Sequence, residues 1–491
     1  MSRQDQFALD LLLPIDRGAG ALHRQIERAL RDGIRDGRLV PGARLPSTRA
    51  AARELGVSRG VVSEAYAQLV AEGWLVARQG APTRVAAAPA PSPPAPRGTR
   101  RPSPPPFDLM PGRPDLAAFP RDQWLAATRR VLRRMPDAAL GYPDPRGTPE
   151  LRHALAGYLG RARAVAPDPE RTVVCSGVTQ GIVLIARLLR ERGDRTIAVE
   201  DPGFHLHRWS LQRAGLRPVG VPVDEEGLDV GALARSGARA VLVTPAHQMP
   251  TGVVLSPERR AALLTWAEQE DGLVVEDDYD AEYRFDRGPV GALQGLAPER
   301  VVYAGSASKS FAHGLRLGWL VLPERLAAPV AAERIAADGG GPVLEQLVLA
   351  DLVERGDLDR HLRRTRREYR RRRSALLAAL AEHLPGAEVV GVAAGLHALV
   401  LLPQAVDEVA VLQRAAAAGV AVESLRSLRV ESSGRPGLVL GYAHLPQPAI
   451  ARAVAALGEV VAASTAPTSP RSASSRAPGP RSRRAAAPPR Q

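Results

Sequence analysis

The stretch VVYAGSASKSFAHGLRLGWL, residues 301–320, contains Lys309, which is the only lysine in the chain. All the other basic residues are arginines, so the composition accepts a guanidinium everywhere except at this position. A lysine amine can lose its proton and condense with an aldehyde, whereas arginine stays protonated and is a poor nucleophile. Because Lys309 is the only lysine and its amine can act as a nucleophile, we predict a chemical role for it.

Short apolar runs like the VVYAGS before Lys309 recur along the chain. Four more are VVCSG (173–177), TIAVEDP (196–202), AVLVTPA (240–246) and LVVEDD (273–278), each followed by a polar or glycine-rich turn and helix-like sequence. Strands that alternate with helices predict an α/β fold around a mostly parallel sheet. Nearly every polar residue of interest falls at a strand end, where ligands bind in such sheets.

The length of 491 residues is about three times that of a usual domain, so we expect a multidomain protein. Residues 87–106 are rich in proline, alanine and serine and predict a semi-extended linker. Residues 463–491 share this character, with more serine and arginine, and predict a disordered basic tail. Two folded domains remain, residues 1–86 and 107–462.

Several classes of protein are excluded. No stretch approaches the roughly 18 uninterrupted apolar residues of a membrane helix, and the apolar patch in MSRQDQFALDLLLPID is too short for a secretory signal. Cys175 is the single cysteine and cannot form an intramolecular disulfide, as expected in a reducing compartment. We therefore expect a soluble cytoplasmic protein without membrane contact, and we predict no metal site.

The net charge of +14 is unevenly distributed along the sequence. The predicted tail contains six arginines and no acid, and the linker adds Arg97, Arg100 and Arg101. Residues 20–86 carry eleven arginines against six acids, and the remainder is close to neutral. This pattern suits phosphate contact by the first domain, although basic tails are often simply solvated.

The first domain has the pattern of three helices and a hairpin. A first apolar helix face is defined by the four-residue spacing of Leu22, Ile26, Leu30 and Ile34. Ser47 is placed to cap a second helix through Leu55, and Ser58 to cap a third that ends near Glu72. WLVARQGAPTRVA then predicts two short strands around a turn at residues 79–82, a candidate wing.

The segment LPSTRAAARELGVSRGVVSEAYAQLVAEGWL, residues 45–75, resembles the winged helix-turn-helix of the GntR-like regulators. The resemblance implies a double-stranded DNA operator as partner, faced by Arg49, Ser58, Arg59, Gln79 and Gly80. Arginine can bind guanine edges bidentately and helix N-termini favour phosphate, although the same arginines also suit a solvated surface. The wing reads QGAPTRV where the family commonly has a GSGTFV-like ending.

The sequence around Lys309 resembles the lysine motif of fold-type I aminotransferases, with serines before the lysine and an arginine seven residues after it. The resemblance implies a Schiff base between Lys309 and pyridoxal 5'-phosphate. It also implies that Ser306, Ser308 and Arg316 grip the cofactor phosphate, for which hydroxyl donors and a bidentate cation are suited. The alternative is an ordinary surface loop.

GLVVEDDYDAEYRF, upstream of Lys309, ends a buried-looking strand with acidic residues. By the same resemblance Asp277 pairs with the pyridinium nitrogen and keeps the ring an electron sink, and Tyr279 bonds the ring hydroxyl. Asp278 is the competing choice for the pyridinium partner. A solvated acidic loop is the alternative to both.

Four further motifs match the aminotransferases in the expected order. The tyrosine of GYPDPRGTPELR, Tyr142, would reach the cofactor phosphate of the partner subunit, and Thr179 in VCSGVTQGI would bind the phosphate at a helix start. Phe204 in EDPGFHLHR would stack on the pyridine ring, although such a residue is often core. TPAHQMPTG lacks the asparagine usual before its proline, so we assign Gln248 in its place.

Winged helix, linker and aminotransferase-like domain together resemble the MocR subgroup of GntR-like regulators over residues 15–462. The resemblance implies a homodimer that is nucleoid-associated when bound to DNA. It also implies an effector that is a small amine, an amino acid or the cofactor itself.

The substrate end of the site departs from the enzymes. Aminotransferases commonly hold the substrate carboxylate with an arginine in a C-terminal segment, and in the matching stretch GLVLGYAHL the position is Val439. Arg208, His205 or Arg435 are candidates to replace that cation. We therefore favour a regulator that senses its effector through an aldimine at Lys309. The alternatives are an active aminotransferase with a DNA-binding appendage and a DNA-binder with a cofactor-free second domain.

Overall fold

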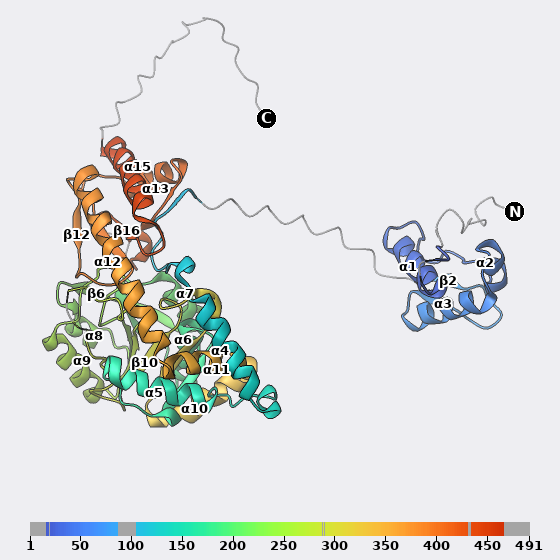
Figure 1. The fold of residues 1–491 in the computed structure, drawn as a ribbon, viewed down its shortest axis with the longest axis horizontal. Helices are drawn as coiled ribbons and strands as arrows, with labels where there is room; N and C mark the ends of the chain where they lie inside the picture. Colours follow the sequence, from blue (N-terminus) through green and yellow to red (C-terminus); the bar gives the residue numbers. More distant parts are fainter. Residues whose placement is uncertain are drawn as a thin grey trace, which may run out of the picture. The chain divides into compact units, whose positions relative to one another are not determined.

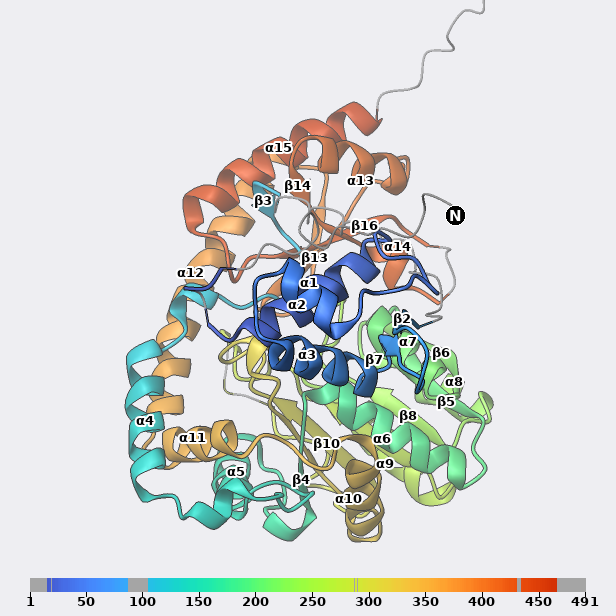
Figure 2. The same cartoon turned by 90° about the vertical axis from the view of Figure 1, so that its right-hand side faces the viewer.

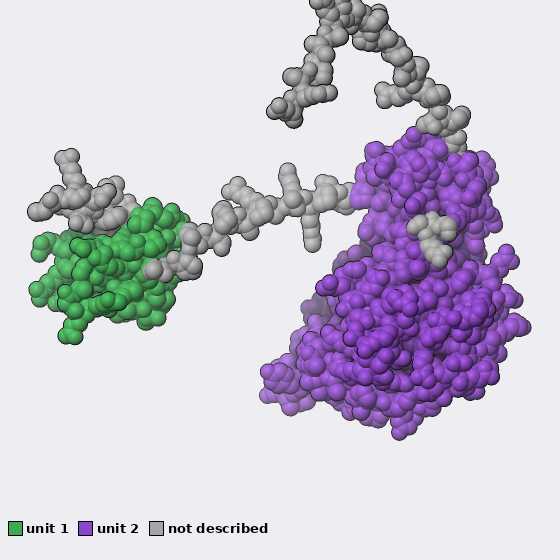
Figure 3. Space-filling model, turned by 180° about the vertical axis from the view of Figure 1, so that it is seen from behind, with its two compact units in different colours: residues 1–103 green, residues 104–491 purple. Residues whose placement is uncertain are grey.

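The computed structural model describes residues 16–86 except 19, and residues 105–465 except 287, 289 and 431–433. The chain divides into two compact units, residues 1–103 and 104–491 (Figure 3). The predicted linker (87–106) and tail (463–491) lie outside the described residues except at 105–106 and 463–465. The last three of these belong to the final helix, which ends at Thr465.

The first unit has the three helices and the hairpin expected from the sequence: α1 (Leu22–Arg35), α2 (Thr48–Glu54), α3 (Arg59–Ala71), β1 (Leu75–Val76) and β2 (Arg84–Val85). The Ser47 hydroxyl accepts from the Ala50 backbone N–H, and the Ser58 hydroxyl accepts from that of Val61, so both predicted caps are formed. The apolar stripe of α1 packs with α2, α3 and both strands in one core. This is a winged helix-turn-helix.

The second unit is built around an eight-stranded sheet in the order β4-β11-β10-β9-β8-β5-β6-β7. Its strands are β4 (Thr172–Cys175), β5 (Thr196–Asp201), β6 (Arg217–Asp224), β7 (Gly227–Leu228), β8 (Ala240–Val243), β9 (Leu273–Asp277), β10 (Val301–Ser306) and β11 (Gly318–Val321). The neighbours from β10 to β6 are parallel, while β11 and β7 are antiparallel. All five predicted strands are confirmed. β6, β7 and β11 were not expected from the sequence.

Helices cover both faces of this sheet (Figures 1 and 2). α6 (Val178–Glu191), α7 (His205–Arg213) and α10 (Glu324–Asp338) pack on one face. The other face is covered by α5 (Pro149–Arg163), α8 (Val230–Arg235), α9 (Pro257–Gln269), α11 (Val343–Glu354) and α12 (Asp357–His383), with α4 (Arg121–Arg134) against α11. Because successive strand residues point to opposite faces, the fully apolar strands bury both sets of side chains.

A smaller lobe completes the second unit. Its sheet has the order β12-β13-β16-β15, formed by β12 (Glu388–Val390), β13 (His397–Leu401), β16 (Gly437–Gly441) and β15 (Glu423–Ser424). α13 (Glu408–Ala417), α14 (Leu425–Leu428) and α15 (Gln447–Thr465) lie beside it, and α12 packs on α15. No described helix is long and apolar enough to cross a membrane.

The start of the second unit is fixed in this smaller lobe. β3 (Phe107–Asp108) pairs in parallel with β14 (Val420–Ala421). The following residues, 111–117, then run along the cavity described next. We call residues 107–117 the strap.

Candidate functional site

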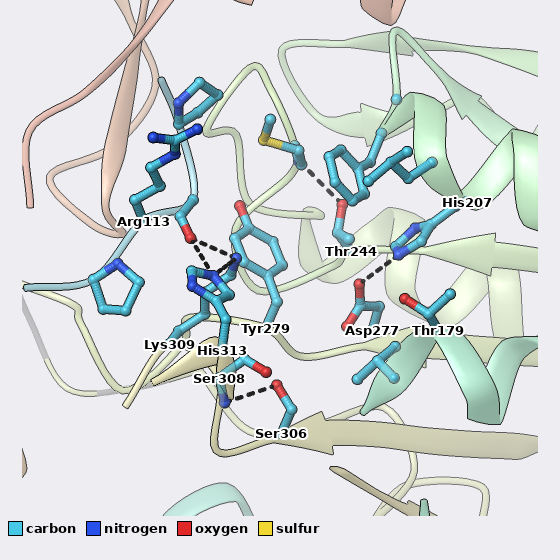
Figure 4. A pocket seen from close by; sticks show the side chains of 18 of the residues that line it. Arg113, Thr179, His207, Thr244, Asp277, Tyr279, Ser306, Ser308, Lys309 and His313 are labelled. Atoms are coloured by element: carbon cyan, nitrogen blue, oxygen red, sulfur yellow. Dashed lines mark hydrogen bonds and ion pairs between the residues drawn. The ribbon is translucent and has the colours of Figure 1, made fainter. Parts of the chain in front are cut away.

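A cavity of about 790 Å³ lies at the carboxyl ends of the parallel strands, under the strap (Figure 4). Eight of the ten residues predicted to surround the cofactor line it: Thr179, Phe204, Asp277, Tyr279, Ser306, Ser308, Lys309 and Arg316. Tyr142 and Gln248 do not line it. The cavity sits where ligands bind in sheets of this kind.

Lys309 follows β10 and presents its amine to the strap. Its Nζ donates to the carbonyl oxygen of Gly112 at 2.7 Å and lies 3.3 Å from His313 Nε2. Burial lowers the pKa of Lys309, because a charged amine loses its hydration there. Burial, together with the nearby Lys309 charge, lowers the pKa of His313 to about 4. Burial thus shifts the pKa of Lys309 in the direction that favours the nucleophilic form of the amine.

Asp277 ends β9 on the opposite wall, and its Oδ1 is buried without a hydrogen-bond partner. Its Oδ2 lies 3.5 Å from Nε2 of His207. Burial raises the pKa of Asp277 to about 8, and the neighbouring Asp278 carboxylate adds to this effect. A buried acceptor without a donor calls for a ligand that brings one, and a protonated ring nitrogen meets that need.

Asp278, the competing choice, is already fully occupied elsewhere. Arg163 donates to both its oxygens, with Nε at 2.6 Å and Nη2 at 3.0 Å, and the Tyr303 hydroxyl donates at 2.7 Å. Asp278 does not line the cavity. The alternation of side chains along an extended chain separates these two neighbours, because Asp277 faces the cavity and Asp278 the buried arginine.

Close to Lys309 in the sequence and in the cavity lie groups that suit an anion. Thr179 is in the first turn of α6, whose N-terminus carries partial positive charge, and Ser306, Ser308 and Arg316 line the same cavity. Arg316 Nη2 donates to the carbonyl of Ser176 at 2.6 Å. Gly177 has φ +83°, and a Cβ there would lie 2.9 Å from that Nη2, so a side chain would displace the guanidinium.

Behind Tyr279 lies a buried polar cluster that we did not predict. The Tyr279 hydroxyl is 3.1 Å from His247 Nδ1, which is itself 3.1 Å from Asp280 Oδ1. His397 from β13 stacks near Tyr279, and burial lowers its pKa to about 3. The signal was present in TPAHQMPTG and DDYD, but histidines in such runs are not diagnostic without the fold.

Gln248 is buried but turned away from the cavity. Its amide donates to Glu200 Oε2 at 3.2 Å and to the carbonyls of Pro202 and Met249, both at 2.8 Å. Met249, which directly precedes Pro250, lines the cavity instead. The structure therefore does not bring Gln248 to the position we assigned to it, because the buried Glu200 carboxyl needs its N–H groups.

Tyr142 lies between η3 (Asp137–Leu140) and α5, and its side chain is fully exposed at 102%. It does not line the cavity of its own chain. The exposed leucines Leu125, Leu132 and Leu140 lie on α4 and η3, in the segment before it.

The end of the cavity towards the smaller lobe offers little to a carboxylate. Val439 is fully buried in β16 among Met249, Leu399, Leu425 and Leu428. Arg208 lines the cavity, but its N–H groups donate to the carbonyls of Gly203, Ser427, Leu428 and Arg429. His205 and Arg435 do not line the cavity, and Arg435 binds Glu388. Arg113 lines it and pairs with Asp108 of the strap.

In the first unit, all five predicted DNA-facing residues are exposed. Arg49 is on α2, Arg59 opens α3 after Ser58, and Gln79 with Gly80 forms the turn between β1 and β2. Arg59 Nε lies 3.4 Å from the Thr48 hydroxyl, which ties the starts of α2 and α3 together.

Comparison with known proteins assigns both units. Residues 22–85 match the model of the bacterial regulatory proteins of the gntR family, and residues 110–457 match aminotransferase class I and II. Among solved structures, an archaeal alanine:glyoxylate aminotransferase superimposes with a TM-score of 0.68 at 26% identity, covering 73% of this chain and 91% of that one. The chain therefore joins a gntR-type DNA-binding domain to an aminotransferase-like domain with the fold of pyridoxal-phosphate enzymes.

Relatives that share both units identify a subgroup within the gntR family. The chain is 34% identical to the probable rhizopine catabolism regulatory protein MocR of Rhizobium meliloti, over 88% of this chain and 92% of the relative. It is 34% identical to the pyridoxine biosynthesis regulator PdxR of Corynebacterium glutamicum (86% and 91%) and 33% identical to TauR of Rhodobacter capsulatus (83% and 89%). The chain belongs to the MocR-type transcriptional regulators of the gntR family.

Proposed function

We propose that this regulator binds pyridoxal 5'-phosphate through Lys309 and senses a small amine or amino acid that competes for that bond. The observation that carries the proposal is the contrast within one cavity. Lys309 and Asp277, whose Oδ1 has no hydrogen-bond partner, face it, while the position that matches the substrate-binding arginine is the buried Val439. We place the regulator in the cytoplasm, associated with the nucleoid when it is bound to DNA.

The described residues suit the cofactor group by group. When bound, pyridoxal phosphate supplies an aldehyde that links to an amine and a ring that withdraws electrons. Asp277 would hold the ring nitrogen protonated, and Phe204 would stack on the ring. Tyr279 would donate to the ring hydroxyl. Thr179, Ser306, Ser308 and Arg316 would bind the phosphate.

The strap offers a way to report the state of Lys309. The free amine donates to Gly112, and His313 Nε2 lies 2.9 Å from the same carbonyl oxygen. A nitrogen covalently linked to a cofactor has fewer N–H groups to donate, so release of Lys309 by an effector amine strengthens its contact with Gly112. The strap begins at Phe107, next to the segment that leads to the first unit. An effector acts only if it favours one of these two arrangements.

We propose regulation rather than sustained transamination, because the cavity lacks a free cation at its apolar end among the described residues. Turnover requires the substrate to be held in a reactive orientation, and a bidentate arginine contributes much of that positioning. The second candidate is an active aminotransferase. The intact Lys309 and Asp277 pair favours it.

The chain is proposed to act as a homodimer. Tyr142 is fully exposed and follows a segment with three exposed leucines on α4 and η3, which a second copy would cover. In such a dimer Tyr142 would reach the cofactor phosphate of the partner.

The test is the visible spectrum of purified protein while a panel of amines and amino acids is added, with keto products assayed in parallel. We expect an absorption band that one ligand shifts without product. A Lys309→Ala variant must lack the band. Sustained keto-acid formation decides for the aminotransferase, and absence of any band in the wild type contradicts cofactor binding.

A further inference from the structure

We infer that the outer face of α12 in the second unit is an additional surface for the DNA phosphate backbone, separate from the winged helix. α12 contains the run RHLRRTRREYRRRR, residues 360–373, with nine arginines. Figures 1 and 2 show α12 as a long helix that passes from the smaller lobe to the large sheet.

The exposed arginines of α12 lie on one face of the helix. The inward face carries the buried residues His361, Leu362, Thr365, Tyr369 and Arg372. The outward face carries the exposed arginines Arg360, Arg363, Arg364, Arg367, Arg370 and Arg371. These follow the three- and four-residue spacing of one helical face. Residues 104–462, which are close to neutral in total, therefore present one strongly cationic stripe.

Most of this stripe has no acidic partner. Arg360 pairs with Asp357, and Arg371 lies 3.6 Å from Glu368. Arg364 and Arg370 donate only to backbone carbonyls or a histidine, and no described carboxylate lies within ion-pair distance of Arg363 or Arg367. By contrast, the half-buried Arg171 binds three acids, Asp168, Glu299 and Glu324.

Two acids beside the stripe, Asp115 and Glu368, form ion pairs with the buried Arg372. Arg372 Nη2 binds Asp115 at 2.8 Å, and Arg372 Nε binds Glu368 at 3.0 Å. Both acids border a groove of about 500 Å³ between α12 and residues 115–118, which is lined by Arg360, Arg363, Arg364, Arg367 and Arg371. Because these carboxylates are already neutralised, the groove remains cationic.

An uncompensated row of like charges destabilises its own helix, since arginines four residues apart repel each other. Binding of a polyanion removes that repulsion. Arg363, Arg367 and Arg371 are about 6 Å apart along the helix axis, and the stripe from Arg360 to Arg371 is about 17 Å long. This length faces about five phosphates of one DNA strand, which are about 3.4 Å apart along the duplex axis.

We choose DNA as the polyanion because another domain of the same chain binds it. The gntR-type head binds DNA, and covalent linkage keeps that DNA at high local concentration near the second unit. The inference does not depend on cofactor or effector binding.

The experiment compares full-length proteins on a fluorescent mixed-sequence duplex of about 60 base pairs, between about 50 and 200 mM salt. The variant Arg363→Gln/Arg367→Gln/Arg371→Gln removes three charges from the stripe. Arg195→Gln/Arg213→Gln/Arg235→Gln is the matched control, because it removes three exposed arginines away from α12. We expect the stripe variant to bind at least about tenfold more weakly at low salt, with a salt slope lower by about 2 to 3.

Two further variants test whether the effect comes from the charge of the stripe rather than from misfolding, and whether it is independent of the winged helix. Replacing the same three arginines by lysine keeps the charge and must preserve most of the binding. In a background with Arg49→Gln and Arg59→Gln, the stripe substitutions must still weaken binding. Unchanged affinity and slope in the stripe variant, or an equal loss in the control, overturns the inference.

Discussion

The two ends of the cavity differ in the kind of group they offer a ligand. One end carries Lys309, Asp277 with its unpartnered Oδ1, and the corner at Arg316 that suits an anion. At the other end Met249 lines the cavity with Val439 buried beside it, and Arg208, which also lines the cavity, donates its N–H groups to carbonyls. Among the described residues, the groups proposed to hold the cofactor therefore line the cavity, while Arg113 and Arg208, which also line it, are engaged with Asp108 and with backbone carbonyls. This difference supports the proposal that the cavity binds the cofactor without sustained turnover.

Loss of Lys309 should abolish the covalent link to the cofactor. Lys309→Ala removes the only lysine amine in the chain, so we expect complete loss of any lysine-dependent visible band. Lys309→Arg keeps a cation but not the nucleophile and serves as the matched control. A persistent band in either variant places the covalent link elsewhere. Thermal unfolding measured in parallel shows whether the variants are folded.

The two neighbouring acids at the end of β9 have opposite predicted effects. Asp277→Asn removes the charge that faces the cavity, and we expect cofactor affinity to fall about 10- to 100-fold with little change in stability. Asp278→Asn leaves the buried Arg163 without its ion-pair partner and lowers the free energy of unfolding by about 3–5 kcal/mol. Cofactor titration and denaturant unfolding of both variants measure this contrast. Equal effects on affinity contradict the assignment of Asp277.

The cofactor-free protein has a stability that depends on pH through Asp277. Its pKa is about 8 in the folded chain and has an ordinary value of 3.8. At this group the folded state therefore binds more protons than the unfolded state between these values, so the stability that Asp277 contributes falls as pH rises from about 4 to 8.

Asp277→Asn must flatten part of that pH dependence. Burial raises the pKa of Glu200 and Glu276 to about 7 in the same direction, so the wild-type slope contains their share as well. Cofactor binding should also flatten it, because a protonated ring nitrogen favours the charged carboxylate. Melting temperatures measured across this pH range test both statements. An identical slope in the variant rules out a raised pKa at Asp277.

The sequence predicted the fold and most of the cavity because strand ends and motifs are local features. The caps at Ser47 and Ser58 and the five core strands are formed as expected. The failures concern non-local packing. The demand of the buried Glu200 for N–H donors turns Gln248 away, and the cluster of His247 with His397 joins residues from two lobes. Likewise, the near-neutral total charge of residues 104–462 conceals the arginine stripe of α12.

The smallest expected effect concerns Tyr142, and it tests whether the cofactor end of the cavity is completed by a second chain. Tyr142→Phe removes one hydroxyl that is fully exposed in the single chain, so stability should not change. If the hydroxyl donates to the partner's cofactor phosphate, affinity for the cofactor falls about 2- to 10-fold, the value of one hydrogen bond.

Leu140→Ala, which removes an exposed apolar group two residues before Tyr142, should instead weaken dimerisation. Mixing Lys309→Ala with Tyr142→Phe chains should generate dimers in which the cofactor bound at the one remaining Lys309 contacts the wild-type Tyr142 of the other chain. Those sites must recover wild-type affinity, whereas no recovery contradicts a shared site.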